Sequence, residues 1–352
     1  MVSTEMSNVE RSLLMIALIF IIIIAAKETA YLVSLFLMAI IITMLASPTL
    51  FWLKKKGLSD FAATLVITLV ACLIILGFIC LTALSVNTVI SDLPQYQQNL
   101  NTRLGDISAM IAPFELSSVV SKHNSLDLGQ LSSLGINGAM TLADTVMFLF
   151  FVGVLTFFML LKVPRIAAHF EGPQGKESQT LHNLYRMTGY VTDFIVVRTE
   201  TNFIHGVLFG GFLGIIGVHG AILWGVLTFL LGYIPYFGLL IAAVPALFFA
   251  WLQFGIPGAV AVIIAICILN LIVENPVMSY LTARKFEMPA LLVLISVIFW
   301  GWLLGLVGML FAVPFSLIGL LVIQSTDELR WINTTLGVEH LFIEQDEKIV
   351  ER

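Results

Sequence analysis

Glu274 is an isolated carboxylate in an apolar run, and it is the residue whose type most strongly suggests chemistry. The run reads CILNLIVENPVMSYL, with Asn270 four residues before Glu274 and Asn275 directly after it. Residues four apart share a helical face, so Asn270 and Glu274 are expected to lie side by side. An ionisable group inside a membrane is costly and indicates function, such as binding a cation or cycling a proton. The alternative is a surface position, with Glu274 hydrated or paired with Arg284 or Lys285.

A second group of polar residues stands at the start of an earlier apolar run. Arg198, Glu200 and Asn202 precede this run, and His205 lies one turn inside it. We interpret these residues as secondary candidates for the pathway of a solute or ion. Anchoring at the membrane surface and an internal ion pair are the alternatives.

Helix-breaking residues interrupt the apolar run between these two groups. Residues 230–245 read LLGYIPYFGLLIAAVP, in which Pro235, Tyr236 and Gly238 form the centre. Proline removes a backbone donor and clashes with the preceding turn. Unpaired backbone groups are costly in lipid, so a break is tolerated only where protein or water covers it. The pattern predicts an unwound stretch whose carbonyls and amides face a cavity, with a simple kink as the alternative.

A similar interruption occurs later in the chain. Residues 299–314 read FWGWLLGLVGMLFAVP and share Trp-Gly, Leu-Leu-Gly and Ala-Val-Pro, in that order, with residues 223–245. Gly305 and Gly308 mark the second break. Two interrupted apolar segments in corresponding places are typical of the binding region of a transporter.

The composition identifies the elements that must position these residues. The chain has 352 residues, of which 59% are hydrophobic and 11% charged, whereas soluble domains carry about 25% charged residues. We therefore expect an all-α polytopic membrane protein. Its apolar segments, about eight in number, fall at 12–26, 30–53, 61–86, 139–161, 203–219, 221–254, 257–281 and 290–325. The segments at 221–254 and 290–325 carry the breaks, and re-entry is an alternative to crossing for both.

Loop charges predict the orientation of the chain. Lys54, Lys55 and Lys56 place the first loop and the N-terminus in the cytoplasm. If every later run crossed once, Arg284 and Lys285 would lie outside, and re-entry of 221–254 removes this conflict.

The same charges divide the chain into five regions. We expect N-terminal membrane helices, an external polar insert that includes a helix at 92–111, and a fourth span followed by a cytoplasmic amphipathic region. The last part of that region, YVTDFIVVRTET, is interpreted as a surface helix. A membrane core with the broken helices and an acidic cytoplasmic tail complete the chain. The five regions are 1–86, 87–138, 139–202, 203–325 and 326–352.

Several functions are disfavoured. The net charge is −5 and no basic stripe is present, which argues against nucleic acid. The sequence contains no Walker loop and no metal-binding or hydrolase motif, so we expect no nucleotide, metal or cofactor and no enzymatic activity. Cys72, Cys80 and Cys267 lie in apolar runs and are expected to be buried, unpaired thiols.

Glycines are frequent in the segment at 203–219. Because spacings of three and four residues place many of them on one face, they predict close packing against another helix. The glycines are Gly206, Gly210, Gly211, Gly214 and Gly217.

These motifs together resemble the autoinducer-2 exporter (AI-2E) family of bacterial and archaeal membrane proteins. The similarity is strongest over 200–325, in the Ile-Pro-Tyr-x-Gly core and the Trp-Gly-Trp-Leu-Leu-Gly signature. The resemblance implies a homo-oligomeric permease in the cell membrane of a prokaryote. Members are assigned to export of the furanone signal autoinducer-2, and others to exchange of sodium or lithium for protons. Many relatives have Asn where Gly232 stands, so an amide expected from the family is missing at this position.

Three functions remain open from the sequence. The first is a secondary transporter that exports a small polar metabolite, with a pathway lined by 235–238, Asn270, Glu274 and 305–308. The second is a cation/proton antiporter that uses Glu274. The third is an oligomeric membrane scaffold whose insert at 87–138 binds a partner.

Overall fold

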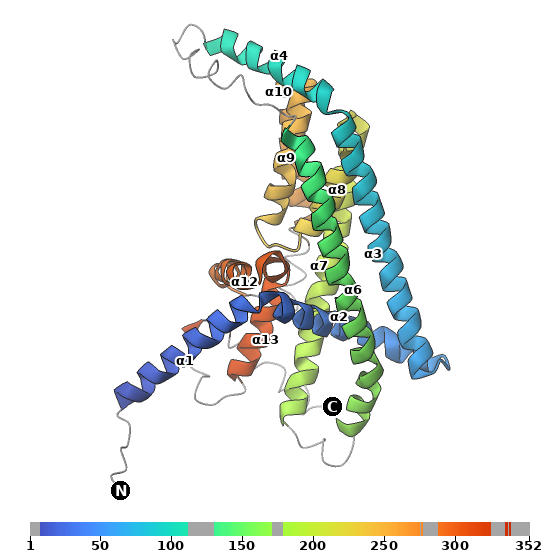
Figure 1. The fold of residues 1–352 in the computed structure, drawn as a ribbon, viewed down its shortest axis with the longest axis vertical. Coiled ribbons are helices and arrows are strands. Elements are labelled where there is room, and N and C mark those ends of the chain that lie inside the picture. The colour runs from blue at the N-terminus through green and yellow to red at the C-terminus, as the bar shows by residue number, and fades with distance from the viewer. Residues whose placement is uncertain are drawn as a thin grey trace.

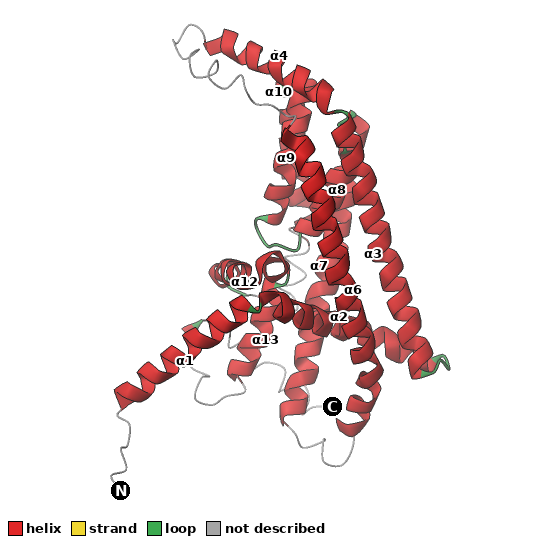
Figure 2. Ribbon diagram, viewed as in Figure 1, coloured by secondary structure: helices red, strands yellow, loops and turns green. Residues whose placement is uncertain are grey.

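The computed structural model describes residues 8–111, 130–170, 179–274, 276, 288–324, 335, 336 and 338. In this part of the chain every regular element is a helix, as the sequence predicts (Figures 1 and 2). The helices are α1 (Asn8–Glu28), α2 (Ala30–Lys55), α3 (Asp60–Ser91), α4 (Leu93–Ile111), α6 (Gln130–Phe170), α7 (Gln179–Ile216), α8 (Ala221–Leu231), α9 (Gly238–Phe254), α10 (Ile256–Leu269), the π-helix η2 (Asn270–Glu274), α12 (Ala290–Leu310) and α13 (Ala312–Gln324).

The apolar segments correspond closely to these helices. Five helical stretches in the described residues are long and apolar enough to cross a membrane, whereas α8 and α9 are too short. The five stretches are Ala30–Lys55, Asp60–Ser91, Asp144–Arg165, Ile256–Glu274 and Ala290–Leu310. The prediction of an all-α polytopic membrane protein is confirmed.

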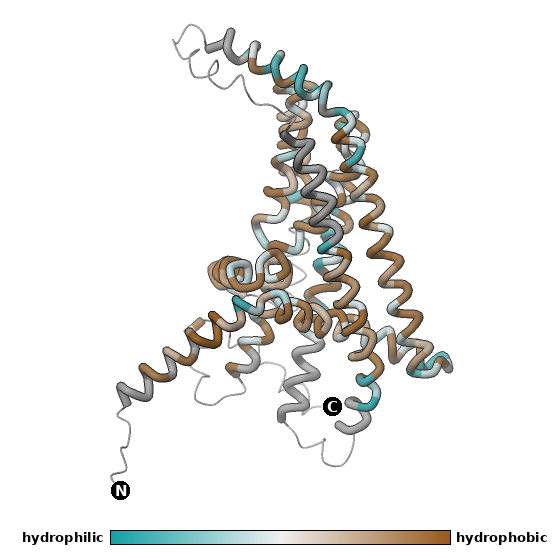
Figure 3. The backbone as a smooth tube through the Cα atoms, in the orientation of Figure 1, coloured by the Kyte–Doolittle hydropathy of each residue, from teal (hydrophilic) through white to brown (hydrophobic). Residues whose placement is uncertain are grey.

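Several helices keep apolar side chains on the outside of the chain. α3 is the clearest case, since it is apolar over most of its length and little of it is covered (Figure 3). Cys72 and Cys80 on α3 and Cys267 on α10 are exposed. The prediction that these thiols are buried within the chain is wrong, because their helices turn these faces outward.

The long helix α7 runs through the centre of the structure. The stretch 190–201 continues into it without a break, and Val191 and Ile195 are buried against Ile41 and Phe315. One face of this stretch therefore packs in the protein core against α2 and α13. Residues 171–178, which precede α7, lie outside the described residues.

Glycines bring α7 and α8 into backbone contact. A Cβ atom built on Gly206 would lie 2.7 Å from the Gly225 carbonyl oxygen, and one on Gly225 would lie equally close to the Gly206 oxygen. A Cβ on Gly210 would lie 3.1 Å from the Gly225 Cα. Close packing is thus confirmed for Gly206 and Gly210. Gly217 instead forms the turn after α7, with φ +80°.

The segment at 221–254 enters and leaves the bundle at the same end. The backbone N–H of His219, just before α8, donates to Gln253 Oε1 near the end of α9 at 3.2 Å. α8 has 11 residues and is about 16 Å long, roughly half the thickness of a membrane core. The structure therefore agrees with re-entry of this segment, whose two arms we call the α8–α9 hairpin.

The second break lies at Gly305 inside α12. Its φ of 65° and ψ of −144° interrupt the helix, although the whole element is long enough to span. The chain folds back here, so that Gly301 contacts Met309 and a side chain on Gly308 would overlap the Trp300 carbonyl. The Trp300 indole N–H then donates to Ser316 Oγ in α13 at 2.9 Å.

We expect Gly225→Ala to destabilise the protein because its Cβ has no space at the contact of α7 and α8. Overpacking of this kind costs about 1–3 kcal/mol, which should lower the melting temperature measured in detergent. Gly211→Ala is the matched control, since nothing lies within 4 Å of a Cβ there. An equal loss of stability in both variants would contradict the close contact.

Candidate functional site

The tip of the α8–α9 hairpin contacts the second broken helix. Ile234 is buried in the tip and packs with Val297 of α12 and Ala312 of α13, and Trp300 and Met309 cover this cluster. Two breaks that are about seventy residues apart in sequence therefore meet in space.

The tip itself is a tight turn at residues 232–237. Tyr236 has a φ of 64°, a left-handed conformation that is unusual for a residue other than glycine. The Phe237 N–H donates to the Pro235 carbonyl at 2.8 Å, and the Gly238 N–H donates to the Ile234 carbonyl at 3.0 Å. Gly238 is required because a Cβ there would overlap the Leu231 carbonyl. The break predicted at Pro235, Tyr236 and Gly238 is confirmed.

An ion pair joins α7 to the end of α10 beside this tip. Arg198 Nη1 lies 2.8 Å from Glu274 Oε1, and Arg198 Nε–H donates to the Gly232 carbonyl at 3.0 Å. The Arg198 side chain is 12% exposed and that of Glu274 is 35% exposed. One guanidinium thus satisfies both a carboxylate and a carbonyl that the break leaves free of helical partners.

A π-helical turn holds Glu274 in this position. Residues 270–274 form η2 at the end of α10, and π turns inside α-helices are rare and frequent at functional sites. Asn270 is exposed at the start of this turn. Asn275, Arg284 and Lys285 lie outside the described residues, and the partner that the structure gives Glu274 is Arg198.

Asn202 lies one turn further along α7 and faces the same tip. It is 1% exposed, and a Cβ at position 232 would lie 2.5 Å from Asn202 Oδ1. Gly232 therefore leaves the space that Asn202 of α7 fills. The Asn202 Nδ2 atom is buried without a hydrogen-bond partner.

Other contacts along α7 complete the site. His205 is buried, and its Nε2 lies 3.3 Å from the Leu269 carbonyl, just before η2. Thr199 Oγ1 donates to the Ile195 carbonyl, so the Tyr233 hydroxyl 2.6 Å away is the donor to Thr199. Thr199 and Tyr233 were not predicted from the sequence, although both adjoin predicted residues. Glu200 is exposed on another face of α7.

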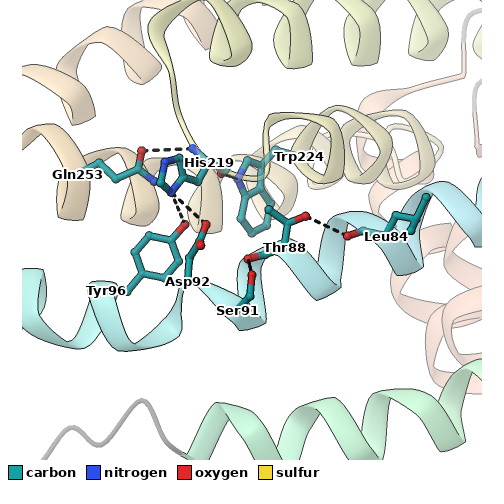
Figure 4. Close-up of polar contacts among 8 residues, drawn as sticks. All are labelled: Leu84, Thr88, Ser91, Asp92, Tyr96, His219, Trp224 and Gln253. Atoms are coloured by element: carbon teal, nitrogen blue, oxygen red, sulfur yellow. Dashed lines mark hydrogen bonds and ion pairs between the residues drawn. The ribbon is translucent and has the colours of Figure 1, made fainter.

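A second polar cluster lies at the base of the hairpin, beside α4 (Figure 4). His219 Nδ1 is 3.1 Å from the Tyr96 hydroxyl and 3.3 Å from Asp92 Oδ2. The Trp224 indole N–H donates to the His219 carbonyl at 3.0 Å. Burial, and then the nearby charge of Asp92, raise the pKa of Tyr96 to about 12.

The chain matches a known protein family over most of its length. The model of the family described as "AI-2E family transporter" matches residues 13–327. The chain belongs to the AI-2E transporter family. The resemblance read from the two broken motifs is thereby confirmed, and this member of the family is a multi-pass membrane transporter.

Curated relatives extend over almost the whole of this AI-2E family chain. The AI-2 transport protein TqsA of Escherichia coli K12 is 25% identical over 317 residues, which are 89% of this chain and 91% of the relative. A Haemophilus influenzae protein with a provisional transport name is 28% identical over 330 residues, or 91% of this chain and 94% of the relative.

A double-mutant cycle measures the coupling between Arg198 and Glu274 in this AI-2E family chain. Arg198→Ala and Glu274→Ala each leave a partner unpaired, so the double variant should be no less stable than Arg198→Ala alone. Contacting residues of this kind couple by about 0.5–3 kcal/mol, measured by thermal or denaturant unfolding. The more exposed pair of Lys54 and Asp60, at 2.7 Å, is the control and should couple by about 0–1 kcal/mol. Additive losses at Arg198 and Glu274 would contradict the pair.

The raised pKa of Tyr96 predicts that the contact of α4 with the hairpin weakens at alkaline pH. Its value in the folded chain, about 12, exceeds the ordinary value of 10.0. The contribution of neutral Tyr96 to the stability of the folded chain is therefore complete below about pH 10 and is lost as pH rises from about 10 to about 12. Phenolate absorbance measured against pH should lose one late-ionising component in Tyr96→Phe relative to wild type. Asp92→Asn should lower this pKa only partly, because burial is the larger cause.

Proposed function

We propose that this transporter moves a small, neutral, polar solute of the autoinducer-2 type outward through the contact of α7 with the two breaks. The observation that carries the proposal is the bond of Arg198 to both Glu274 and the Gly232 carbonyl. Because the two side chains neutralise one another, the site has little net charge to attract an ion. A solute with hydroxyl and carbonyl groups matches the unpartnered Asn202 amide better than a bare cation does.

Asn202 is the proposed donor to an oxygen of the solute. Its Nδ2 atom is buried and unpartnered, and such a group costs about 1–3 kcal/mol. A solute oxygen that accepts from Nδ2 would recover this cost. Since Asn202 is covered by Gly232, binding requires the turn at 232–238 to move away. Asn270, Asn275, Pro235, Tyr236, Gly238, Gly305 and Gly308 remain proposed pathway residues, with Glu200 and His205 as secondary ones.

Loop charges and exposed apolar faces support the proposed setting. Lys54, Lys55 and Lys56 favour a cytoplasmic N-terminus in the cell membrane of a prokaryote. The uncovered apolar faces of helices such as α3 would contact lipid. Following the resemblance, we propose that further copies of the chain also assemble in the bilayer.

Efflux from proteoliposomes loaded with autoinducer-2 tests the proposal. Wild type should release the solute faster than empty vesicles do. Asn202→Leu should slow release about tenfold or more, since a lost hydrogen bond in a buried site costs on the order of 1.4 kcal/mol. Glu274→Gln should retain more efflux than Gly238→Val, because a side chain at 238 overlaps the Leu231 carbonyl. Gly77→Val on α3 is the control, with nothing within 4 Å of its Cβ.

The same vesicles distinguish the alternatives. Proton movement that depends on sodium and disappears in Glu274→Gln would support the antiporter and contradict the proposed solute. Absence of both fluxes would contradict transport of these substrates and favour the scaffold, which should then lose a partner on deletion of 92–130.

A further inference from the structure

The turn between α2 and α3 packs against the last part of the spanning stretch of α6. Leu50, Ala63 and Leu160, one from each of these helices, are fully buried in one cluster. Leu58 of the turn and Val163 of α6 pack against the same cluster. The end of α2, the start of α3 and this part of α6 are therefore held together.

These three helix segments carry an excess of positive charge. Their cationic residues are Lys54, Lys55, Lys56, Lys162 and Arg165. Asp60 is the only carboxylate in residues 29–91 and 145–170, and it pairs with Lys54 at 2.7 Å. The other four cationic side chains are exposed. Among the described residues the structure gives these four no carboxylate partner.

Aromatic side chains mark the boundary between this basic group and an apolar surface. Lys56 Nζ lies 3.8 Å from the ring centroid of Trp52, whose indole is exposed. Tryptophan is enriched where a membrane meets water. Phe61 begins the exposed apolar face of α3 and meets Phe157 of α6 edge-on, with ring centroids 6.0 Å apart. The basic residues thus border a surface of the kind that acyl chains cover.

The chemistry of this boundary matches one class of lipid. Ammonium and guanidinium groups are donors without acceptors, and a phosphodiester offers them anionic oxygen atoms. The head group of a zwitterionic phospholipid adds a cation of its own beside four others, whereas that of an anionic phospholipid does not. Basic pockets between membrane helices on the cytoplasmic side bind anionic head groups, and the loop charges predict that this turn is cytoplasmic.

We propose that this junction binds an anionic phospholipid, with its phosphate between the end of α2 and α6. Lys55 and Lys56 donate to the phosphate from the end of α2. Lys162 and Arg165, which are three residues apart and therefore neighbours on α6, donate from the other side. Trp52 lies against the glycerol region, and the acyl chains follow the apolar face of α3. The site does not depend on which solute is transported.

A role at the helix end alone accounts for only part of this arrangement. Lys54 and Lys55 stand in the last turn of α2, where cations interact favourably with the helix dipole. That explanation does not extend to Lys162 and Arg165, because α6 continues to Phe170. A helix-end role also gives no preference between lipids, so lipid selectivity distinguishes the two explanations.

Quenching of Trp52 fluorescence by brominated lipid tests the site in the full-length protein. The protein is reconstituted into vesicles of equal parts phosphatidylglycerol and phosphatidylcholine, in which one or the other lipid carries bromine. The signal of Trp52 is the difference between each protein and the same protein with Trp52→Phe. Wild type should favour phosphatidylglycerol about fivefold or more, since one basic residue near an anionic head group contributes on the order of fivefold.

Removing the cations from either side should reduce this preference. Lys55→Gln/Lys56→Gln and Lys162→Gln/Arg165→Gln should each bring the ratio of the two lipids toward one. Lys55→Arg/Lys56→Arg keeps the charges and should keep the wild-type ratio. Because the readout is a ratio at one tryptophan, a general change in stability does not imitate the loss.

Lys27→Gln/Arg103→Gln is the matched control, because it removes two charges from α1 and α4, outside the three packed segments. It should keep the wild-type ratio. Equal quenching by the two lipids in wild type, or a preference that survives in both Gln double variants of the junction, would overturn the proposal. A preference abolished by inorganic phosphate, but not by sodium chloride of equal ionic strength, would assign the cations to a free phosphate and contradict the lipid.

Discussion

The structure depends on how an apolar chain satisfies backbone groups where its helices stop. In lipid a helix must bond its own peptide groups, and every interruption leaves some of them without partners. The turn at 232–237 meets this requirement partly within itself and partly through Arg198, whose Nε–H binds the Gly232 carbonyl. Glu274 then balances the charge of Arg198. The break therefore requires polar partners for its free backbone groups. Arg198 and Glu274 provide them, and this allows the break to exist in an apolar surrounding.

This dependence explains why so much of the fold could be predicted from the sequence. Apolar runs predict the helices, and the glycines and prolines at 232–238 and at Gly305 predict where these helices are interrupted. Close packing of α7 was also predicted, since Gly206 and Gly210 recur on one helical face, but the sequence did not identify α8 as the partner helix. In each of these cases a local property of the chain is sufficient to determine the structure.

The candidate site was less predictable because its contacts join residues far apart in the sequence. Glu274 was identified, but its bond to Arg198 spans 76 positions and no periodicity specifies it. The sequence instead suggested Arg284 and Lys285, which are near in the chain. Asn270 was predicted to share a face with Glu274 and is exposed. The thiols at Cys72, Cys80 and Cys267 were misplaced because an apolar run does not say whether its neighbour is protein or lipid.

The backbone contact of α7 with α8 limits how this transporter can change shape. Helices that touch through Gly206 and Gly225 with no intervening side chains cannot slide or rotate past each other without first separating. They must act as a single unit, and the turn at Gly217 and Gly220 that joins them lies inside this unit. A hinge that moves the tip of the hairpin against α7 therefore has to lie beyond the end of α8, in the turn where Tyr236 has a positive φ angle.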